Sequence, residues 1–155
     1  LDLCASGFYE GSAFHRVIPG FMAQAGRSKD GTPAPRKVQA EFNSRRHVAG
    51  VLSAARLGTD MDSAESEFFI VHRTSPHLDQ TYSAFGQVLT GMEAVEAIVD
   101  TVEKNEAFLE KLKKGGVRID DRNPQVAMAL HDPSPAQTIR KAVVVRATKS
   151  RPKKK

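Results

Sequence analysis

The feature that most constrains the fold of this chain is the segment from Phe14 to Gln24, in which a strand-like alternation is interrupted by a proline and a glycine. Residues 14–18 alternate as a β-strand does, which predicts that Phe14, Arg16 and Ile18 share one face. The Pro19-Gly20 pair then predicts a turn, because proline has no N–H to donate and glycine tolerates turn geometry. Two large apolar side chains and an amide follow this turn: Phe21, Met22 and Gln24.

An arginine beside these apolar groups suits a shallow pocket that holds a neutral group and directs a fixed charge at it. The same residues also fit an ordinary core strand whose arginine is solvated on the far face. The segment alone therefore leaves two interpretations, and the rest of the chain has to decide between them.

The length of 155 residues predicts one domain with a core large enough to fold without cross-links. Cys4 is the single cysteine, so no internal disulfide is expected and packing must hold the fold. No run of 18 apolar residues is present, so no membrane-spanning helix is predicted. We expect a cytoplasmic protein, but the chain does not begin with methionine, so a periplasmic or secreted location stays open.

The formal net charge of +5 raises the question of nucleic-acid binding. The basic residues gather in the terminal segment 149–155 and, mixed with glutamates, in 104–114. Neither segment contains interleaved aromatic residues that could stack on bases. A solvated tail is the main interpretation, and weak contact with nucleic acid or another acidic surface is the alternative.

Short apolar runs and two amphipathic patterns predict the secondary structure. A helix should end near residue 6 and two more should cover 90–99 and 105–114, the last ended by Gly115-Gly116. Strands are predicted at 14–18, 37–42, 50–55, 67–72, 84–89 and 142–147, with 37–42 at an edge and 67–72 between two packed layers. This pattern predicts an antiparallel barrel or sandwich capped by helices.

Several kinds of site are not predicted. The five histidines show no spacing typical of metal ligands. Ser53 lacks the Gly-x-Ser-x-Gly context and Asp79 has no evident partner, so hydrolase chemistry is not indicated. Glycine-rich phosphate loops are also absent from the sequence. We therefore expect no metal and no cofactor.

Ordered motifs along the chain give a more specific indication. They are Gly7-Phe-Tyr-Glu-Gly, Phe14-His-Arg-Val-Ile-Pro-Gly-Phe-Met-Ala-Gln, Glu41-Phe-Asn, Gly50-Val-Leu-Ser-Ala-Ala-Arg, Ser66-Glu-Phe-Phe-Ile, His77-Leu-Asp, Phe85-Gly-Gln-Val and Gly91-Met-Glu. With these motifs the chain closely resembles a cyclophilin, most nearly of the bacterial kind, over residues 1–99 and the last predicted strand. The resemblance implies a mainly β fold, an eight-stranded antiparallel barrel closed by helices.

The resemblance also implies peptidyl-prolyl cis–trans isomerase activity without a cofactor. The expected partners are proline-containing segments of unfolded or exposed proteins, bound by a monomer. The family fold begins with two strands and most of a helix before the position of Leu1. The expected domain is therefore 1–148 without those strands, with an extra helical insert at about 101–133 and a basic tail at 149–155.

Site residues follow from the same resemblance, position by position. Arg16 matches the catalytic arginine of the family. Phe21, Met22, Phe69 and Leu78 match the walls of its proline pocket, Gln24 matches a hydrogen-bonding residue, and Ala55 and Arg56 match the pair whose backbone meets the peptide. Three departures within the expected substrate site are Glu67 in place of the usual glutamine, His77 in place of tryptophan in animal members, and Tyr82 in place of a frequent histidine.

Two alternatives to full isomerase activity remain open at this stage. An ionised Glu67 would attract a nearby guanidinium, so one hypothesis is that it partly sequesters Arg16 and slows turnover; the other is that it points to solvent without effect. A proline-binding module with little turnover is then the main alternative. A weaker alternative assigns the helix at 105–114 and the basic tail to docking on another macromolecule.

Overall fold

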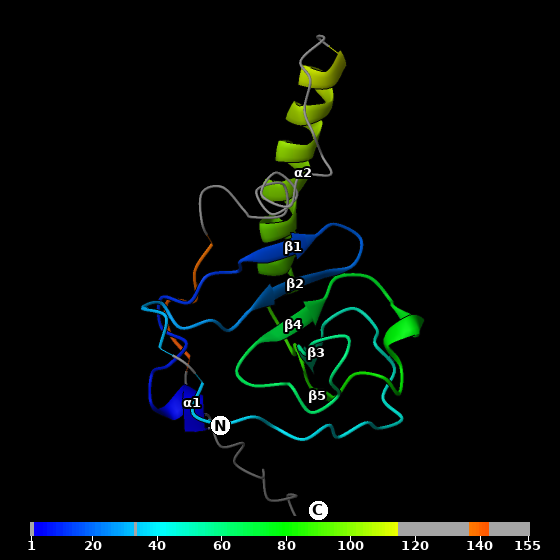
Figure 1. Cartoon of the computed structure of the whole chain (residues 1–155). Helices are drawn as coiled ribbons and strands as arrows, with labels where there is room; N and C mark the ends of the chain where they lie inside the picture. The colour runs from blue at the N-terminus through cyan, green and yellow to red at the C-terminus, as the bar shows by residue number, and fades with distance from the viewer. Residues whose placement is uncertain (1, 33, 115–136, 143–155) are drawn as a thin grey trace, which may run out of the picture.

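The computed structural model describes residues 2–32, 34–114 and 137–142, and of α2 it describes the backbone but not the side chains at 105–109 and 111–113. The described residues form one five-stranded antiparallel sheet in the order β1-β2-β4-β3-β5 (Figure 1). Its strands are β1 (Arg16–Ile18), β2 (Met22–Ala25), β3 (Val51–Ala54), β4 (Phe68–Val71) and β5 (Ala84–Gln87). The helices are α1 (Asp2–Ala5), the 3₁₀ turn η1 (Pro76–Leu78) and α2 (Met92–Lys114). The expectation of a mainly β, antiparallel fold with few helices is confirmed.

The first hairpin forms where the alternating segment predicts it. Arg16 pairs with Gln24, and Ile18 pairs with Met22. Gly20 lies in the turn with a φ of +73°, a backbone conformation that favours glycine because it has no Cβ. The turn closes with a hydrogen bond of 3.0 Å from the Phe21 N–H to the Ile18 carbonyl.

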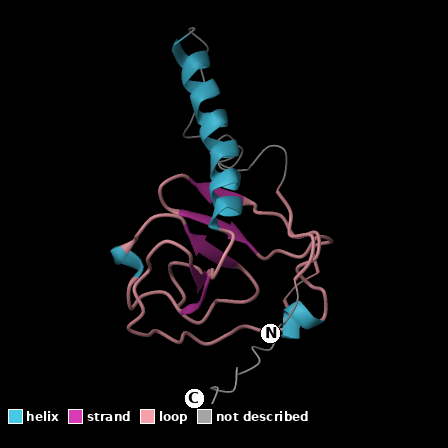
Figure 2. Cartoon of the chain, turned by 180° about the vertical axis from the view of Figure 1, so that it is seen from behind, coloured by secondary structure: helices cyan, strands magenta, loops and turns pink. Residues whose placement is uncertain are grey.

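Alternation along the strands gives the sheet two different faces. One face, which we call the helix face, packs against α2, which runs past β1 and β2 and extends beyond the sheet (Figure 2). Its buried residues are Phe14, Val17, Ala23, Ala25, Val95, Val99 and Val102. The opposite face, which we call the pocket face, buries Met22, Val51, Phe69, Val71, Leu78 and Ala84. Strand β4 is apolar on both faces, as predicted for 67–72.

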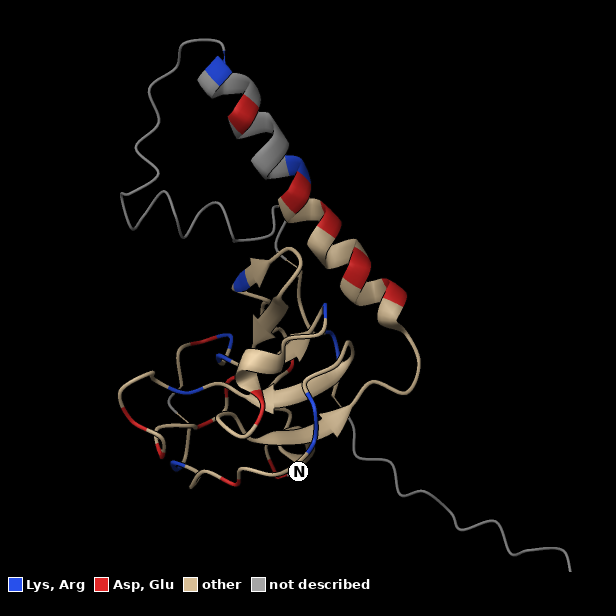
Figure 3. Ribbon diagram, turned by 90° about the vertical axis from the view of Figure 1, so that its right-hand side faces the viewer, with Lys and Arg blue, Asp and Glu red and all other residues tan. Residues whose placement is uncertain are grey.

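Charged residues lie almost entirely outside the sheet. Within the five described strands, Arg16 is the only charged residue. Figure 3 shows acidic residues following one another along α2, with lysine at its far end. Among the described residues, no helix has the length and hydropathy needed to cross a bilayer.

Three predictions about secondary structure are wrong. Phe14 packs with Val17 on the helix face and not beside Arg16, because strand pairing begins only at Arg16. Residues 37–42 form a single bridge, Val38 to Ala64, and no strand. The helices predicted at 90–99 and 105–114 are one continuous helix, since Val102 extends the apolar stripe across the expected gap.

The later part of the chain returns to the start of the described sheet. Thr138 forms a bridge with Ala13, and the Phe14 N–H donates to the Gln137 carbonyl at 2.9 Å. The strand predicted at 142–147 falls, beyond residue 142, outside the described residues. The same holds for the glycine pair that should end the helix predicted at 105–114 and for most of the insert predicted at 101–133.

Candidate functional site

A cavity of about 210 Å³ opens on the pocket face. It is lined by Arg16, Phe21, Met22, Gln24, Ala55, Arg56, Phe69, Leu78 and Tyr82. These residues come from β1, β2, β4, the end of β3 and the segment around η1, so segments far apart in sequence build one hollow. The structure thus brings together nine of the eleven residues that the sequence singles out.

A row of cross-strand partners explains how the sheet builds this hollow. Arg16 lies opposite Gln24 and Gln24 lies opposite Phe69. Phe69 lies opposite Ser53, which in turn lies opposite Ala84. Because directly paired residues point to the same face of a sheet, the whole row faces the pocket side.

Arg16 stands exposed at one end of this row. Its Nη1 donates to Gln24 Oε1 over a long distance of 3.4 Å. The same amide donates from Nε2 to Glu67 Oε2 at 2.6 Å. Gln24 therefore stands between the cation and the carboxylate, and its carbonyl oxygen is turned toward the guanidinium.

Glu67 is held by three side chains. Besides Gln24, Arg27 Nε donates to Oε1 at 2.9 Å. The Nε2 of His15 lies 3.2 Å from Oε2. The contacts with His15, Arg27 and Gln24, in that order, lower the pKa of Glu67 to about 2 against the opposing effect of burial.

The expected pairing of Glu67 with Arg16 is wrong for the described structure. The carboxylate is satisfied by Arg27 and Gln24, and the guanidinium of Arg16 contacts only the amide between them. Glu67 instead lines a neighbouring hollow of about 360 Å³ that shares Gln24, Ala55 and Arg56 with the first.

Aromatic and cationic contacts form the rim of the cavity. The Arg56 guanidinium carbon lies 4.6 Å from the centre of the Tyr82 ring, and its Nε and Nη2 donate to the Thr81 carbonyl at 3.2 and 3.0 Å. Tyr82 meets Phe69 edge to face at 5.7 Å. His77 does not line the cavity but packs against the Phe21 ring, with the ring centres 5.3 Å apart.

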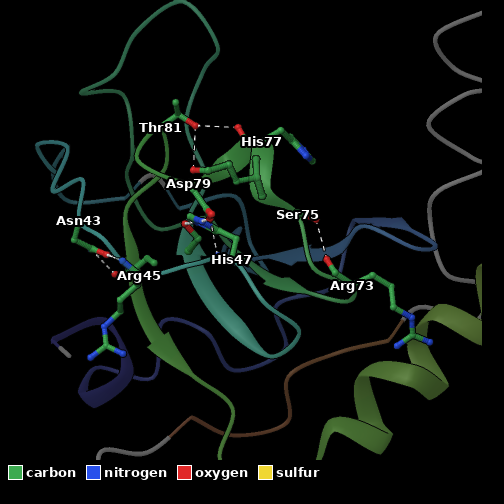
Figure 4. A network of polar contacts seen from close by, with 11 residues as sticks. Asn43, Arg45, His47, Arg73, Ser75, His77, Asp79 and Thr81 are labelled. Atoms are coloured by element: carbon green, nitrogen blue, oxygen red, sulfur yellow. Dashed lines mark hydrogen bonds and ion pairs between the residues drawn. The ribbon is translucent and has the colours of Figure 1, made fainter.

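Sequence reasoning missed a polar cluster beneath the pocket. Asp79 Oδ1 accepts from the His47 backbone N–H at 2.7 Å and lies 3.0 Å from His47 Nδ1 (Figure 4). The other ring nitrogen of His47 lies 3.1 Å from Ser53 Oγ. Asp79 therefore does have a partner, His47, which lies 32 residues away along the chain. No local sequence motif indicates this pairing.

Within the described residues, no group of histidine, cysteine, aspartate or glutamate side chains could hold a metal ion. The cavity thus presents two guanidinium groups, those of Arg16 and Arg56, and the amide of Gln24 beside its apolar walls.

The sequence model described as "Cyclophilin type peptidyl-prolyl cis-trans isomerase/CLD" matches residues 1–121 of this chain. The chain belongs to the cyclophilin family. Its cyclophilin relatives include "Peptidyl-prolyl cis-trans isomerase B" of Bacillus subtilis, 45% identical over 95 residues, which are 59% of this chain and 65% of the relative. A Synechococcus elongatus peptidyl-prolyl cis-trans isomerase is 47% identical over 89 residues, 56% of this chain and 60% of that protein.

A solved cyclophilin has a similar fold over the part of the chain that it matches. The structure of a Cryptosporidium parvum cyclophilin-type peptidyl-prolyl cis-trans isomerase in the presence of the dipeptide Ala-Pro superposes with a TM-score of 0.56 and 28% identity. The match covers 65% of this chain and 68% of that one. The chain thus spans about two thirds or less of the length of these cyclophilins.

Proposed function

We propose that this cyclophilin chain is a peptidyl-prolyl cis–trans isomerase acting on Xaa-Pro bonds in exposed or unfolded protein segments. The observation that carries the proposal is the position of Arg16, the only charge in the five described strands, on the lining of a cavity with several apolar walls. Family membership supports the same activity. The Ala-Pro dipeptide present with the Cryptosporidium relative supports a proline peptide as the ligand.

The reaction requires rotation about a bond and no covalent exchange. Rotation about a peptide bond faces a barrier of about 18–20 kcal/mol, because the nitrogen lone pair is delocalised into the carbonyl. At prolyl bonds both isomers are accessible, yet exchange takes tens of seconds or longer. A catalyst therefore needs no nucleophile, and it must only bind the twisted amide more tightly than the planar one.

Arg16 is suited to this differential binding. When the amide twists, its nitrogen regains a lone pair and becomes a hydrogen-bond acceptor, which the planar nitrogen is not. A guanidinium is permanently charged and presents donors in a fixed fork. Arg16 can therefore donate to the prolyl nitrogen in the transition state and not in the ground state.

One such bond is too weak to account for efficient catalysis alone. A charge-assisted hydrogen bond contributes about 1.5–3 kcal/mol, whereas a ~10⁵-fold acceleration needs about 7 kcal/mol. We assign the remainder to the apolar walls, which hold the proline ring and exclude water from the carbonyl. These walls are Phe21, Met22, Phe69 and Leu78, with the backbone near Ala55 and Arg56 anchoring the peptide.

Gln24 and Glu67 contribute to the orientation of this site. Because Glu67 accepts from Gln24 Nε2, the amide oxygen is directed toward Arg16. An amide oxygen attracts the guanidinium less strongly than a carboxylate would. Arg16 thus stays oriented but free to exchange its partner for the substrate nitrogen.

The test is an exchange experiment on a short Ala-Pro peptide, with NMR lineshapes reporting both affinity and isomerisation rate. The wild-type chain should accelerate exchange, and Arg16→Ala should lower kcat/KM about 100-fold while changing peptide affinity less than about threefold. Arg73→Ala is the matched control, since Arg73 is an exposed arginine paired with Glu96 away from the cavity. Saturable binding by the wild type without faster exchange would overturn the proposal and select a proline-binding module.

A further inference from the structure

His47 is the most completely enclosed titratable group near the pocket, with 1% of its surface exposed. Both of its ring nitrogens have partners: Asp79 Oδ1 at 3.0 Å from Nδ1 and Ser53 Oγ at 3.1 Å from Nε2. A carboxylate can only accept, so Nδ1 carries the proton of the neutral ring. The Ser53 hydroxyl then donates to Nε2, and both ring nitrogens of His47 are satisfied.

These contacts join three segments that each carry a wall of the cavity. Asp79 directly follows Leu78, and the Ser75 N–H donates to the His47 carbonyl at 2.8 Å, so the η1 segment is attached at both ends. Ser53 lies in β3, two residues before Ala55. The ring of His47 stacks on Phe69 in β4, with centres 6.4 Å apart and planes inclined by 23°.

The same three side chains have the order of contacts found in a Ser-His-Asp hydrolase, in which the serine must reach the substrate. Here Ser53 is completely buried, and neither it nor His47 is among the residues that line the cavity. The Ser53 hydroxyl forms its hydrogen bond with the His47 ring nitrogen inside the protein. This cluster can therefore hold walls in place, but it cannot attack a bound peptide.

We propose that His47 is a positioning residue that sets the width of the cavity by holding the Leu78, Ala55 and Phe69 walls at fixed separations. The inference rests on the proposed function, since the cavity is taken to receive a proline ring. It predicts an effect on affinity more than on turnover, because the walls contact the ring in both ground and transition states. Arg16, which acts only in the transition state, makes no described contact with His47.

The experiment compares His47 variants in the full chain, with peptide affinity and exchange rate at saturation measured separately on the Ala-Pro peptide. His47→Phe retains a ring against Phe69 and loses both hydrogen bonds, so the Kd should rise about tenfold with the saturated rate within about twofold. His47→Asn retains a donor near the Nδ1 position and should restore part of the affinity. Val99→Ala, which opens a void on the helix face, is the control for lost stability and should leave the Kd unchanged.

If His47→Phe does not fold, Asp79→Ala provides the second test. Asp79 is partly exposed, with 28% of its side chain accessible, and its loss removes the acceptor for both His47 donors. The same rise in Kd is expected. Unchanged affinity in either folded variant, or a fall confined to the saturated rate, would overturn the inference. Wild-type binding without isomerisation would overturn the proposed activity alone, because the Kd series still tests His47.

Discussion

The helix face and the pocket face are made by the same strands, yet they bury different chemistry. The helix face packs valine, alanine and phenylalanine against α2. The pocket face places Ser53 and His47 beneath Phe69, fully buried and hydrogen-bonded. A shift of one residue in the strand register would exchange the two faces. The alternation along each strand therefore separates the residues that stabilise the fold from those that shape the site.

A second buried histidine sharpens this comparison. His72 accepts the Gly20 N–H on Nδ1 at 3.0 Å, and its Nε2 lies 2.7 Å from Glu96 Oε2 on α2. Its neutral tautomer is thus the opposite of that of His47. The two partners also differ in kind: the Gly20 N–H can only donate, whereas the Ser53 hydroxyl can donate or accept.

The largest expected effect comes from a charge on the helix face. Val99 is 1% exposed, and Val99→Asp would bury a carboxylate with no partner against β1 and β2. We expect the free energy of unfolding to fall by about 4 kcal/mol or more. Ala97→Asp, at an exposed position of the same helix, should cost about 0.5 kcal/mol. Urea denaturation of the two variants measures the difference, and equal losses would show that α2 does not support the sheet.

Adjacent phenylalanines in β4 test the separation of the faces directly. Phe69 lines the cavity, while its neighbour Phe68 packs toward the helix face. Both Phe69→Leu and Phe68→Leu should lower stability by about 1–2 kcal/mol. Only Phe69→Leu should also raise the Kd for an Ala-Pro peptide, by about tenfold. An equal rise in the Kd of Phe68→Leu would contradict the separation of the helix face from the pocket face.

Much of the fold and most of the cavity could be predicted from the sequence. The apolar run of β4 and the Pro19-Gly20 turn are local signals, and the structure contains both elements. The residues that line the cavity follow from a motif resemblance that covers residues 1–99. Without that resemblance, the alternating strand leaves Arg16 open between a pocket residue and a solvated arginine on an ordinary core strand.

The remaining features depend on contacts that one-dimensional patterns do not encode. His47 and Asp79 meet only because the η1 segment folds back onto the chain that precedes β3, and the His77-Leu-Asp motif does not indicate that Asp79 pairs with His47. Glu67 was expected to bind the nearest guanidinium in the predicted site, but Gln24 lies between them across a strand pair. Residues 37–42 have the composition of a strand and lack the partner strand that would make them one.

Acid pH should lower the stability of the folded protein by protonating Glu67. Its folded-state pKa of about 2 lies below the ordinary value of 4.5, so its stabilising effect is complete above pH 4.5 and is lost as the pH falls toward 2. Solvent screening limits the effect to about 1 kcal/mol. Glu67→Gln should flatten this part of the stability–pH curve, measured by urea midpoints between pH 2 and 5. Glu65→Gln, at an exposed position nearby, should leave the slope unchanged.

The same variant tests turnover near neutral pH. Glutamine at position 67 still offers an oxygen to Gln24 Nε2, so the amide keeps its direction and the exchange rate should change less than about threefold. A large increase in rate on the Ala-Pro peptide would instead mean that Glu67 restrains Arg16 after all. That result would restore the expectation drawn from the sequence and contradict the contacts described above.

The smallest expected effect is at the rim, where Arg56 covers Tyr82 and donates to the Thr81 carbonyl. Arg56→Lys retains the charge but loses the planar fork and most of the stacking, so stability should fall by only about 0.5 kcal/mol. Because Arg56 lines the cavity, the KM for the peptide should also rise, about twofold. Arg73→Lys makes the same exchange beside Glu96 on α2 and should leave KM unchanged. If the two lysine variants shift KM equally, Arg56 makes no specific contribution to peptide binding. The binding site would then consist of the row of paired residues from Arg16 to Phe69.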